Sequence, residues 1–392
     1  MAGVVSIVVQ RASASGDQLS KKSDWGSVLS KYNQDRLPEV RGTLCHAPSV
    51  NLNFDQSGNA TACCYNRRFI LGSYPRQSIA EIWNGLKTQQ LRDLLKAGDL
   101  SRGCQICEHQ LRAGNYGGLL ARAFDKQAIG DKNDDHSPRT IEFEISNTCN
   151  LECVMCSGYF SSSIRRNREK LEPLENVYDE HFVAQLEAFW PKLRQAKFLG
   201  GEPFLNPLYY KIWDSIVKIN PELEAVITTN ATIMNQKVSA LLTKLKPRIV
   251  VSCDSLDPKV YESIRVNADF KSFYKNLQTF IALGEQHQRP ISLAICPMVS
   301  NWRTLPEIVN FANRNWVTVY FNTVIWPPEQ SIRYLPRAQI KEIHEFLRKE
   351  TPWPPADTLK WIFSNNNSAY EGLINQICLW ETEHRDDEVA GP

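Results

Sequence analysis

Three cysteines in one short run constrain this chain more than any other feature. Residues 146–156 read SNTCNLECVMC, which places Cys149, Cys153 and Cys156 in a C-x3-C-x2-C spacing. This spacing supplies three thiolates to one metal cluster and leaves a fourth position for another ligand. A structural zinc site is the alternative interpretation, but zinc takes four ligands, usually from two C-x2-C knuckles. No fourth ligand lies nearby, so the pattern favours an iron–sulfur cluster with one open iron.

The composition is that of a globular protein that works in a reducing compartment. The 392 residues suffice for one large and one small domain, and the formal net charge of +2 argues against a nucleic-acid partner. No apolar run approaches the roughly 20 residues that span a bilayer. The short apolar segment Val4–Val9 lacks the basic start of a signal peptide. We therefore expect a cytoplasmic protein with no membrane partner, whose eleven cysteines serve as metal ligands rather than disulfides.

Composition shifts along the chain predict four regions. Residues 1–40 are polar and are expected to form a loosely attached arm with one short helix, and residues 41–128 form a compact cysteine-bearing region. The polar segment 130–138 is expected to link this region to a second module over residues 139–326. Residues 327–392 contain several prolines followed by helical patterns, and we expect this tail to cover the edge or mouth of the second module.

In the second module, short β-branched runs alternate with amphipathic segments. Six strands alternating with helices predict an α/β fold with a parallel sheet, and six units suit a partial (β/α)6 barrel. Functional groups should then collect at the carboxyl ends of the strands. The expected strands are Thr140–Ser146, Lys197–Gly200, Ala225–Thr229, Ile249–Cys253, Ile291–Met298 and Val317–Val324. The expected helices include Tyr178–Trp190, Pro207–Ile219, Gln236–Leu245, Lys271–Leu283, Leu305–Asn315 and Arg337–Lys349.

The cysteine run after the first of these strands resembles the radical S-adenosylmethionine (radical SAM) superfamily, whose cysteine triad matches Cys149, Cys153 and Cys156 position by position. The resemblance implies a [4Fe–4S] cluster whose open iron is chelated by S-adenosylmethionine. It also implies reductive cleavage of that molecule to a 5′-deoxyadenosyl radical, which abstracts hydrogen from a substrate. The cofactor carries this chemistry, and an external one-electron donor of the flavodoxin or ferredoxin type is implied as a partner.

A second motif, Gly200-Gly201-Glu202-Pro203, ends the second expected strand and matches the GGEP motif of the family, which grips the methionine amino group. Glycines let backbone approach a ligand closely, and a glutamate suits an ammonium group. For Arg265 the resemblance implies contact with the methionine carboxylate, with a solvated surface arginine as the equal alternative. Met155 lies where the family often places an aromatic residue near the adenine. Strand-end residues with implied contacts to the ribose and the carboxylate are Thr229, Asn230, Ser252 and Asp254.

The amino-terminal region carries a second cysteine set that is similar to the SPASM/Twitch modules of radical SAM enzymes. The resemblance implies one auxiliary [4Fe–4S] cluster on Cys45, Cys63, Cys104 and Cys107, with Cys64 as the alternative to Cys63. Structural zinc on the same four cysteines is the simpler alternative. Two features depart from the family: the module precedes the barrel, and its few cysteines fit the single-cluster Twitch form better than a full SPASM domain.

The resemblance covers residues 139–325 of the second module and implies several reactions. Oxidative or epimerising modification of a peptide, as in the maturation of ribosomally made peptides, is the main hypothesis. Dehydrogenation of an amino sugar or similar small metabolite is the alternative, and a non-catalytic iron–sulfur redox sensor is a third, which the Gly200–Pro203 motif disfavours. Cys253 lies where a thiol can return a hydrogen atom to a substrate radical, as in radical epimerases, although a small buried core residue is the favoured interpretation.

Overall fold

The computed structural model describes residues 25–112, 114, 116, 119–129, 137–352 and 359–384. The first part of the expected arm and residues 130–136 of the expected linker lie outside this description. Within the described residues, no helix is both long and apolar enough to cross a membrane.

Among the described residues, one nine-stranded sheet extends from Asn51 to Phe321, in the order β3-β2-β1-β4-β5-β6-β7-β8-β9. From β4 to β9 each strand pairs in parallel with the next in sequence, which confirms the predicted α/β class and the parallel sheet of a partial barrel. These six strands are β4 Thr140–Phe143, β5 Gln195–Phe198, β6 Glu224–Thr229, β7 Arg248–Ser252, β8 Ser292–Ile295 and β9 Thr318–Phe321.

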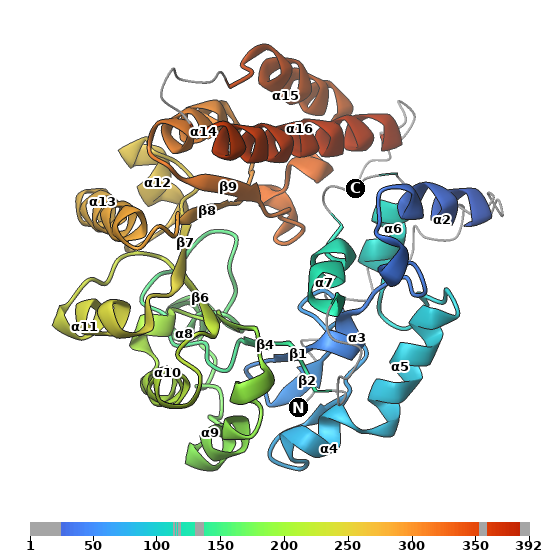
Figure 1. Cartoon of the computed structure of the whole chain (residues 1–392). Helices are drawn as coiled ribbons and strands as arrows, with labels where there is room; N and C mark the ends of the chain where they lie inside the picture. Colours follow the sequence, from blue (N-terminus) through green and yellow to red (C-terminus); the bar gives the residue numbers. More distant parts are fainter. Residues whose placement is uncertain are drawn as a thin grey trace.

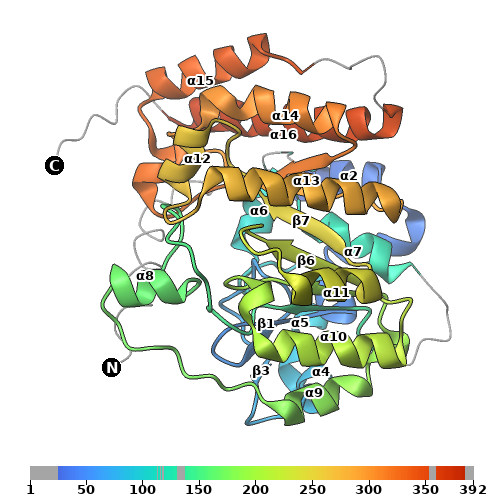
Figure 2. The ribbon, with the colours of Figure 1, turned by 90° about the vertical axis from the view of Figure 1, so that its left-hand side faces the viewer.

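The crossover helices cover the outer face of this curved sheet (Figures 1 and 2). Most of them begin at an Asp or Asn whose side chain accepts a backbone amide hydrogen, as Asn206 and Asn235 do at α10 and α11. Beneath them, rings such as Phe143, Phe198 and Trp213 form a buried aromatic core. The helices are α8 Ser162–Asn167, α9 Glu180–Glu187, α10 Pro207–Ile219, α11 Gln236–Leu245, α12 Pro258–Ile264, α13 Phe270–Gln286 and α14 Leu305–Arg314.

The opposite face of the sheet, here called the inner face, carries charged and polar side chains among smaller apolar ones. Side chains alternate along a strand, so the neighbours of the buried Phe143 and Phe198 point away from the aromatic core. Register pairing sets Glu142 of β4 beside Lys197 of β5. Continued across the sheet, the same alternation gives the inner face Val226, Arg248, Ser252, Ala294 and Tyr320.

The amino-terminal region continues the sheet instead of standing apart from it. Strand β1, Asn51–Phe54, pairs in parallel with β4 and antiparallel with β2, Asn59–Thr61, which in turn pairs with β3, Gly72–Ser73. Sequence patterns did not predict this continuity, because asparagine is a poor strand former and these strands are very short. The helices of this region are α2 Trp25–Gln34, α3 Ala47–Val50, α4 Ile79–Trp83, α5 Leu86–Lys96, α6 Gln105–Arg112 and α7 Ala121–Ala128.

The predicted helical tail is present as α15, Arg337–Lys349, and α16, Lys360–Glu383. Helix α16 lies along the edge strand β9 (Figure 1). Asn366 of α16 accepts a hydrogen bond from the Val319 amide at 2.8 Å and donates one to the Val317 carbonyl at 2.9 Å. The tail thus satisfies backbone groups that an open sheet edge would leave unpaired.

Candidate iron–sulfur and cofactor site

The three cysteines of the C-x3-C-x2-C run lie in the loop that follows β4, at the carboxyl edge of the sheet. Serines at the start of α8 hold this loop: Ser163 donates to the Cys149 carbonyl at 2.8 Å, and Ser161 donates to the Leu151 carbonyl at 2.7 Å. The Cys156 amide donates to the Cys153 carbonyl at 3.0 Å, which turns the last two cysteines back toward each other. The loop is therefore shaped by its own hydrogen bonds.

Burial and mutual proximity make these thiols costly to ionise. Burial, with a smaller contribution from the neighbouring cysteines, raises the pKa of Cys153 to about 11 and that of Cys156 to about 12. Arg265 opposes these effects at all three thiols. A metal centre binds thiolates and relieves such a penalty, so three close, partly exposed thiols beside one cation fit a cluster ligated by cysteine.

The Gly200-Gly201 pair lets the loop after β5 pack directly against the triad loop. Both glycines have positive φ, +77° and +56°, a region that other residues rarely adopt. A Cβ at Gly201 would lie 2.2 Å from the Thr148 carbonyl oxygen, and one at Gly200 would lie 2.9 Å from the Ser146 carbonyl oxygen. The adjacent Glu202 amide donates to Thr148 at 2.7 Å. In this structure, the close approach made by the two glycines is to the triad loop.

Glu202 is fully buried and held by three donors. Its carboxylate accepts from the Thr229 hydroxyl at 2.8 Å, the Asn230 amide at 2.7 Å and the Phe204 amide at 3.3 Å. Burial raises its pKa to about 7, although these hydrogen bonds favour the ionised form. Thr229 and Asn230 therefore orient Glu202, which was not part of the prediction for them. A cationic group bound next to this carboxylate would stabilise its ionised form.

Arg265 is buried rather than solvated, so the surface alternative is wrong. Its Nη2 lies 2.7 Å from the carboxylate of the fully buried Asp254, and its Nη1 lies 3.9 Å from the Cys153 sulfur. The other oxygen of Asp254 accepts the Cys296 amide at 2.8 Å, which ties the ends of β7 and β8 together. This buried pair places a guanidinium beside the triad with its orientation fixed.

Met155 packs in a small apolar cluster apart from the main core. Its partners include Ile264, Met298 and Val324, with Cys296 at the margin. Sequence reasoning missed Met298 and Val324, because single apolar residues after a strand carry no motif. This apolar surface adjoins the triad through Met155 itself, which lies between Cys153 and Cys156 in sequence.

Two other predicted residues lie in different settings. Ser252 ends β7 on the inner face and is partly exposed. Cys253 is fully buried within the main apolar core, with its sulfur 3.6 Å from the Ser255 carbonyl oxygen. This placement favours the interpretation of Cys253 as a core residue.

The second cysteine set surrounds a separate cavity in the amino-terminal region. Cys45, Cys63, Cys104 and Cys107 line about 450 Å³ of space, in part open to solvent, whose remaining walls are mostly leucine and alanine. Burial raises the pKa of Cys63 and Cys107 to about 12 each, and nearby cysteines add to both shifts. Among the described residues, no three His, Cys, Asp or Glu side chains converge to hold a single metal ion. Four thiols around a shared space fit a larger cluster.

Cys64 does not line this cavity. Its thiol lies near Glu142 and Glu144 of the inner face, whose charges raise its pKa together with the dominant effect of burial. Consecutive residues of the loop thus face two different sites. The placement supports the choice of Cys63 over Cys64 as the cluster ligand.

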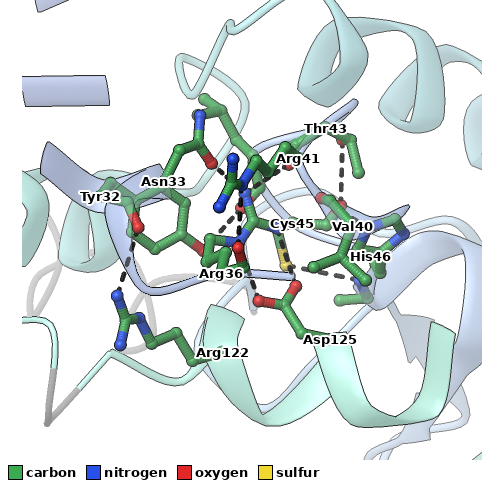
Figure 3. Close-up of polar contacts among 12 residues, drawn as sticks. Tyr32, Asn33, Arg36, Val40, Arg41, Thr43, Cys45, His46, Arg122 and Asp125 are labelled. Carbon is green, nitrogen blue, oxygen red and sulfur yellow. Dashed lines mark hydrogen bonds and ion pairs between the residues drawn. The ribbon is translucent and has the colours of Figure 1, made fainter. Parts of the chain in front are cut away.

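A buried ion pair fixes the segment that leads into Cys45 (Figure 3). Arg36 donates to both oxygens of Asp125 at 2.8 Å each, and its guanidinium stacks 4.4 Å from the ring of Tyr32. Tyr32 in turn donates to the Leu44 carbonyl at 3.0 Å, next to Cys45. The part of the expected arm from residue 25 to residue 40 is therefore firmly packed rather than loosely attached. The sequence gives no sign of this, because the partner Asp125 lies 89 positions away.

Comparison with known families identifies both modules. Residues 143–312 match the radical SAM superfamily, and residues 45–108 match the iron–sulfur cluster-binding domain called SPASM. The chain therefore carries a radical SAM domain with a SPASM domain ahead of it in sequence, as predicted. These domains imply a SAM-binding [4Fe–4S] cluster, an auxiliary cluster and S-adenosylmethionine as cofactors.

Curated relatives share only part of their length with this chain. A GTP 3′,8-cyclase of Clostridium botulinum is 23% identical over 221 residues, which cover 56% of this chain and 66% of that protein. A probable GTP 3′,8-cyclase of Methanosarcina mazei is 30% identical over 127 residues, covering 32% of this chain and 35% of that protein.

Solved structures show similarly partial matches. SuiB of Streptococcus suis, bound to S-adenosylmethionine, aligns with a TM-score of 0.40 and 17% identity, covering 67% of this chain and 59% of that one. The anSMEcpe structure with bound AdoMet aligns with a TM-score of 0.40 and 14% identity, covering 54% of this chain and 59% of that one.

Proposed function

We propose that this protein is a radical SAM enzyme that removes a hydrogen atom from an unactivated carbon of a peptide substrate and uses an auxiliary cluster to move an electron. The main support for this proposal is that three thiols, the buried Glu202 and the Arg265–Asp254 pair lie together at the carboxyl edge of one parallel sheet. These groups come from the ends of β4, β5 and β7 and from the end of α12. Nothing in the hydrophobic core requires charged groups to gather there.

Each part of this edge has a binding role in the proposal. Cys149, Cys153 and Cys156 hold the cluster, and Glu202 receives the methionine ammonium, with Thr229 and Asn230 orienting it. The apolar cluster around Met155 covers the adenine. Arg265 contributes positive charge beside Cys153 and the methionine carboxylate. When bound, S-adenosylmethionine and the cluster supply the hydrogen-abstracting radical, and the protein excludes water and fixes the geometry.

The auxiliary cluster is proposed to sit in the cavity lined by Cys45, Cys63, Cys104 and Cys107. Four cysteines complete the coordination of such a cluster, which leaves electron transfer as its role. It would accept the electron left on the substrate after hydrogen removal, so the net reaction is an oxidation, or it would relay an electron inward. A protein of the flavodoxin or ferredoxin type is proposed to donate the electron that reduces the cluster at the triad site.

The charge balance of the inner face favours a peptide over a nucleoside triphosphate, the substrate named for the curated relatives. Glu142 pairs with Lys197, Glu144 with Arg67, and Glu224 with Arg248. Each cation of these pairs has a carboxylate partner, so this surface has no net positive charge to balance the several negative charges of a triphosphate, whereas a partly exposed cation of a pair can still meet a single carboxylate.

An anaerobic assay tests the proposal. The reconstituted protein should contain about eight irons per chain, as two [4Fe–4S] clusters require, and should release 5′-deoxyadenosine when given dithionite and S-adenosylmethionine. Deuterium from a labelled peptide should appear in that product, whereas labelled GTP should give none. A fully loaded protein that releases no 5′-deoxyadenosine would support the redox-sensor alternative and refute the enzyme.

A further inference from the structure

The inner face of the sheet carries a pair of cations that no part of the proposed chemistry uses. Lys197 lies on β5, and its Nζ is 2.7 Å from Glu142 on β4. The Lys197 side chain is 28% exposed, whereas that of Glu142 is 5% exposed. The carboxylate is therefore the buried anchor, and the ammonium is the group that a ligand can reach.

Arg67 repeats this arrangement at Glu144, directly after the end of β4. It belongs to the loop that carries Cys63 and Cys64, and its Nη2 lies 2.8 and 2.9 Å from the two oxygens of Glu144. The Glu144 side chain is 7% exposed and that of Arg67 is 39% exposed. Again a buried carboxylate holds an accessible cation, and Glu142 and Glu144 are two positions apart on one face.

One ring contact and several electrostatic neighbours relate these two cations to both cysteine sites. The Arg67 guanidinium lies 5.3 Å from the ring of Phe160, which follows the triad loop. Cys64, beside the proposed ligand Cys63, lies within electrostatic reach of both Lys197 and Arg67. On strand β9, Tyr320 lies within electrostatic reach of both Cys296 and Cys64. Cys296 in turn lies near Cys153 and Cys156.

We propose that Lys197 and Arg67 form a carboxylate-binding subsite that holds an acidic group of the substrate between the two cluster sites. An arginine held at one edge by a carboxylate presents its remaining donors in a fixed plane, which suits a second carboxylate. The ammonium of Lys197 keeps donors beyond the one directed at Glu142. The subsite deepens the proposed function, since it gives the peptide an acidic side chain or a carboxyl terminus as its recognition element.

Binding of a small dicarboxylate tests the subsite without turnover. Glutarate is titrated by calorimetry into the anaerobically reconstituted protein, with neutral glutaramide as the control ligand. We expect glutarate to bind and glutaramide not to bind. The K197M and R67Q variants should each bind glutarate at least tenfold more weakly. Because K197M leaves Glu142 unpaired, the double variant K197M/E142Q is measured too, and it should show the same loss.

A matched variant separates local recognition from overall charge. Lys211 on the outer helix α10 pairs with Glu180, and K211M removes the same charge far from the inner face. K211M should bind glutarate as the original protein does. Equal glutarate binding by K197M/E142Q and K211M, or no binding by the original protein, overturns the subsite. Release of 5′-deoxyadenosine, measured on the same samples without substrate, reports on the proposed function separately.

Discussion

The two cysteine sites rest on frameworks of different kinds. The triad loop extends from a parallel sheet whose aromatic core is fully buried beneath long helices. The auxiliary cavity is lined by residues of helices α3, α5, α6 and α7 and of the loops between them, and a buried ion pair fixes its entry segment. Apolar burial alone can hold the first framework, whereas the second depends on specific polar contacts and on whatever fills the space among its cysteines. The difference predicts unequal responses to mutation.

The strongest expected effect is loss of the triad site through C153S. Removal of one of three thiolates should abolish release of 5′-deoxyadenosine and lower the iron content by about four per chain. Iron analysis and product chromatography measure both quantities. The sheet should remain folded, because the triad loop keeps its own hydrogen bonds. Activity at the original level would contradict the role of Cys153.

Loss of an auxiliary thiol should affect folding as well as iron. We expect C107S to lose about four irons per chain and to unfold at lower denaturant concentration, since the cavity loses the cluster that ties its walls together. Release of 5′-deoxyadenosine without substrate should persist. C64S is the matched control and should keep all its iron. Iron loss in C64S instead would assign the ligand to Cys64.

Breaking the ion pair beside Cys45 tests the polar dependence of the amino-terminal framework. D125N leaves Arg36 buried without its charged partner, which should cost about 3 kcal/mol of unfolding free energy. Denaturant titration measures the loss. K211M, which breaks an exposed pair on the barrel, should change the same quantity by less than about 1 kcal/mol. Similar losses in both variants would remove the contrast.

Substitution of Glu202 should change the affinity for S-adenosylmethionine rather than the stability of the fold. E202Q removes the charge offered to the methionine ammonium and should weaken S-adenosylmethionine binding by about tenfold to a hundredfold. The pKa of Glu202 is about 7 because of its burial, and only the ionised form attracts an ammonium. The affinity of the original protein should therefore fall as pH drops below about 7, and that of E202Q should not. Binding titrations from pH 6 to 8 decide the matter.

The smallest expected effect belongs to Cys253. Its thiol is enclosed by the barrel core, so C253A should cost about 1 kcal/mol of stability through lost packing and leave substrate turnover unchanged. Turnover lost with stability retained would restore the hydrogen-donor hypothesis.

Sequence patterns predicted the barrel well because its elements carry local signals. The predicted bounds of α10, α11 and α15 match the structure, and Asn206 and Asn235 mark two of the starts. The carboxyl ends of β4, β8 and β9 were each predicted three residues too long, because Ile145, Met298 and Val324 continue the apolar pattern past the last ladder bond, whereas the end of β6 was predicted correctly. The cysteine triad was recognisable from its C-x3-C-x2-C spacing, and the GGEP motif from four consecutive residues.

Contacts between distant parts of the sequence were beyond this reasoning. Arg36 meets Asp125 across 89 positions, and Arg67 meets Glu144 across 77. Each of these residues is an ordinary charged residue in its own segment, and the pairing arises only when the sheet forms. The burial of Arg265 could not be predicted either, because it depends on the ion pair with Asp254 and not on the residues next to Arg265 in sequence.

The parallel pairing of β1 with β4 also bears on the order of biosynthesis. A nascent chain emerges amino terminus first, so the auxiliary region is made before the strand on which its own hairpin must rest. Its hairpin lacks the parallel partner of β1 until residues 140–143 arrive and complete the ladder. The sheet of the auxiliary region is thereby completed only after the first strand of the barrel has been made.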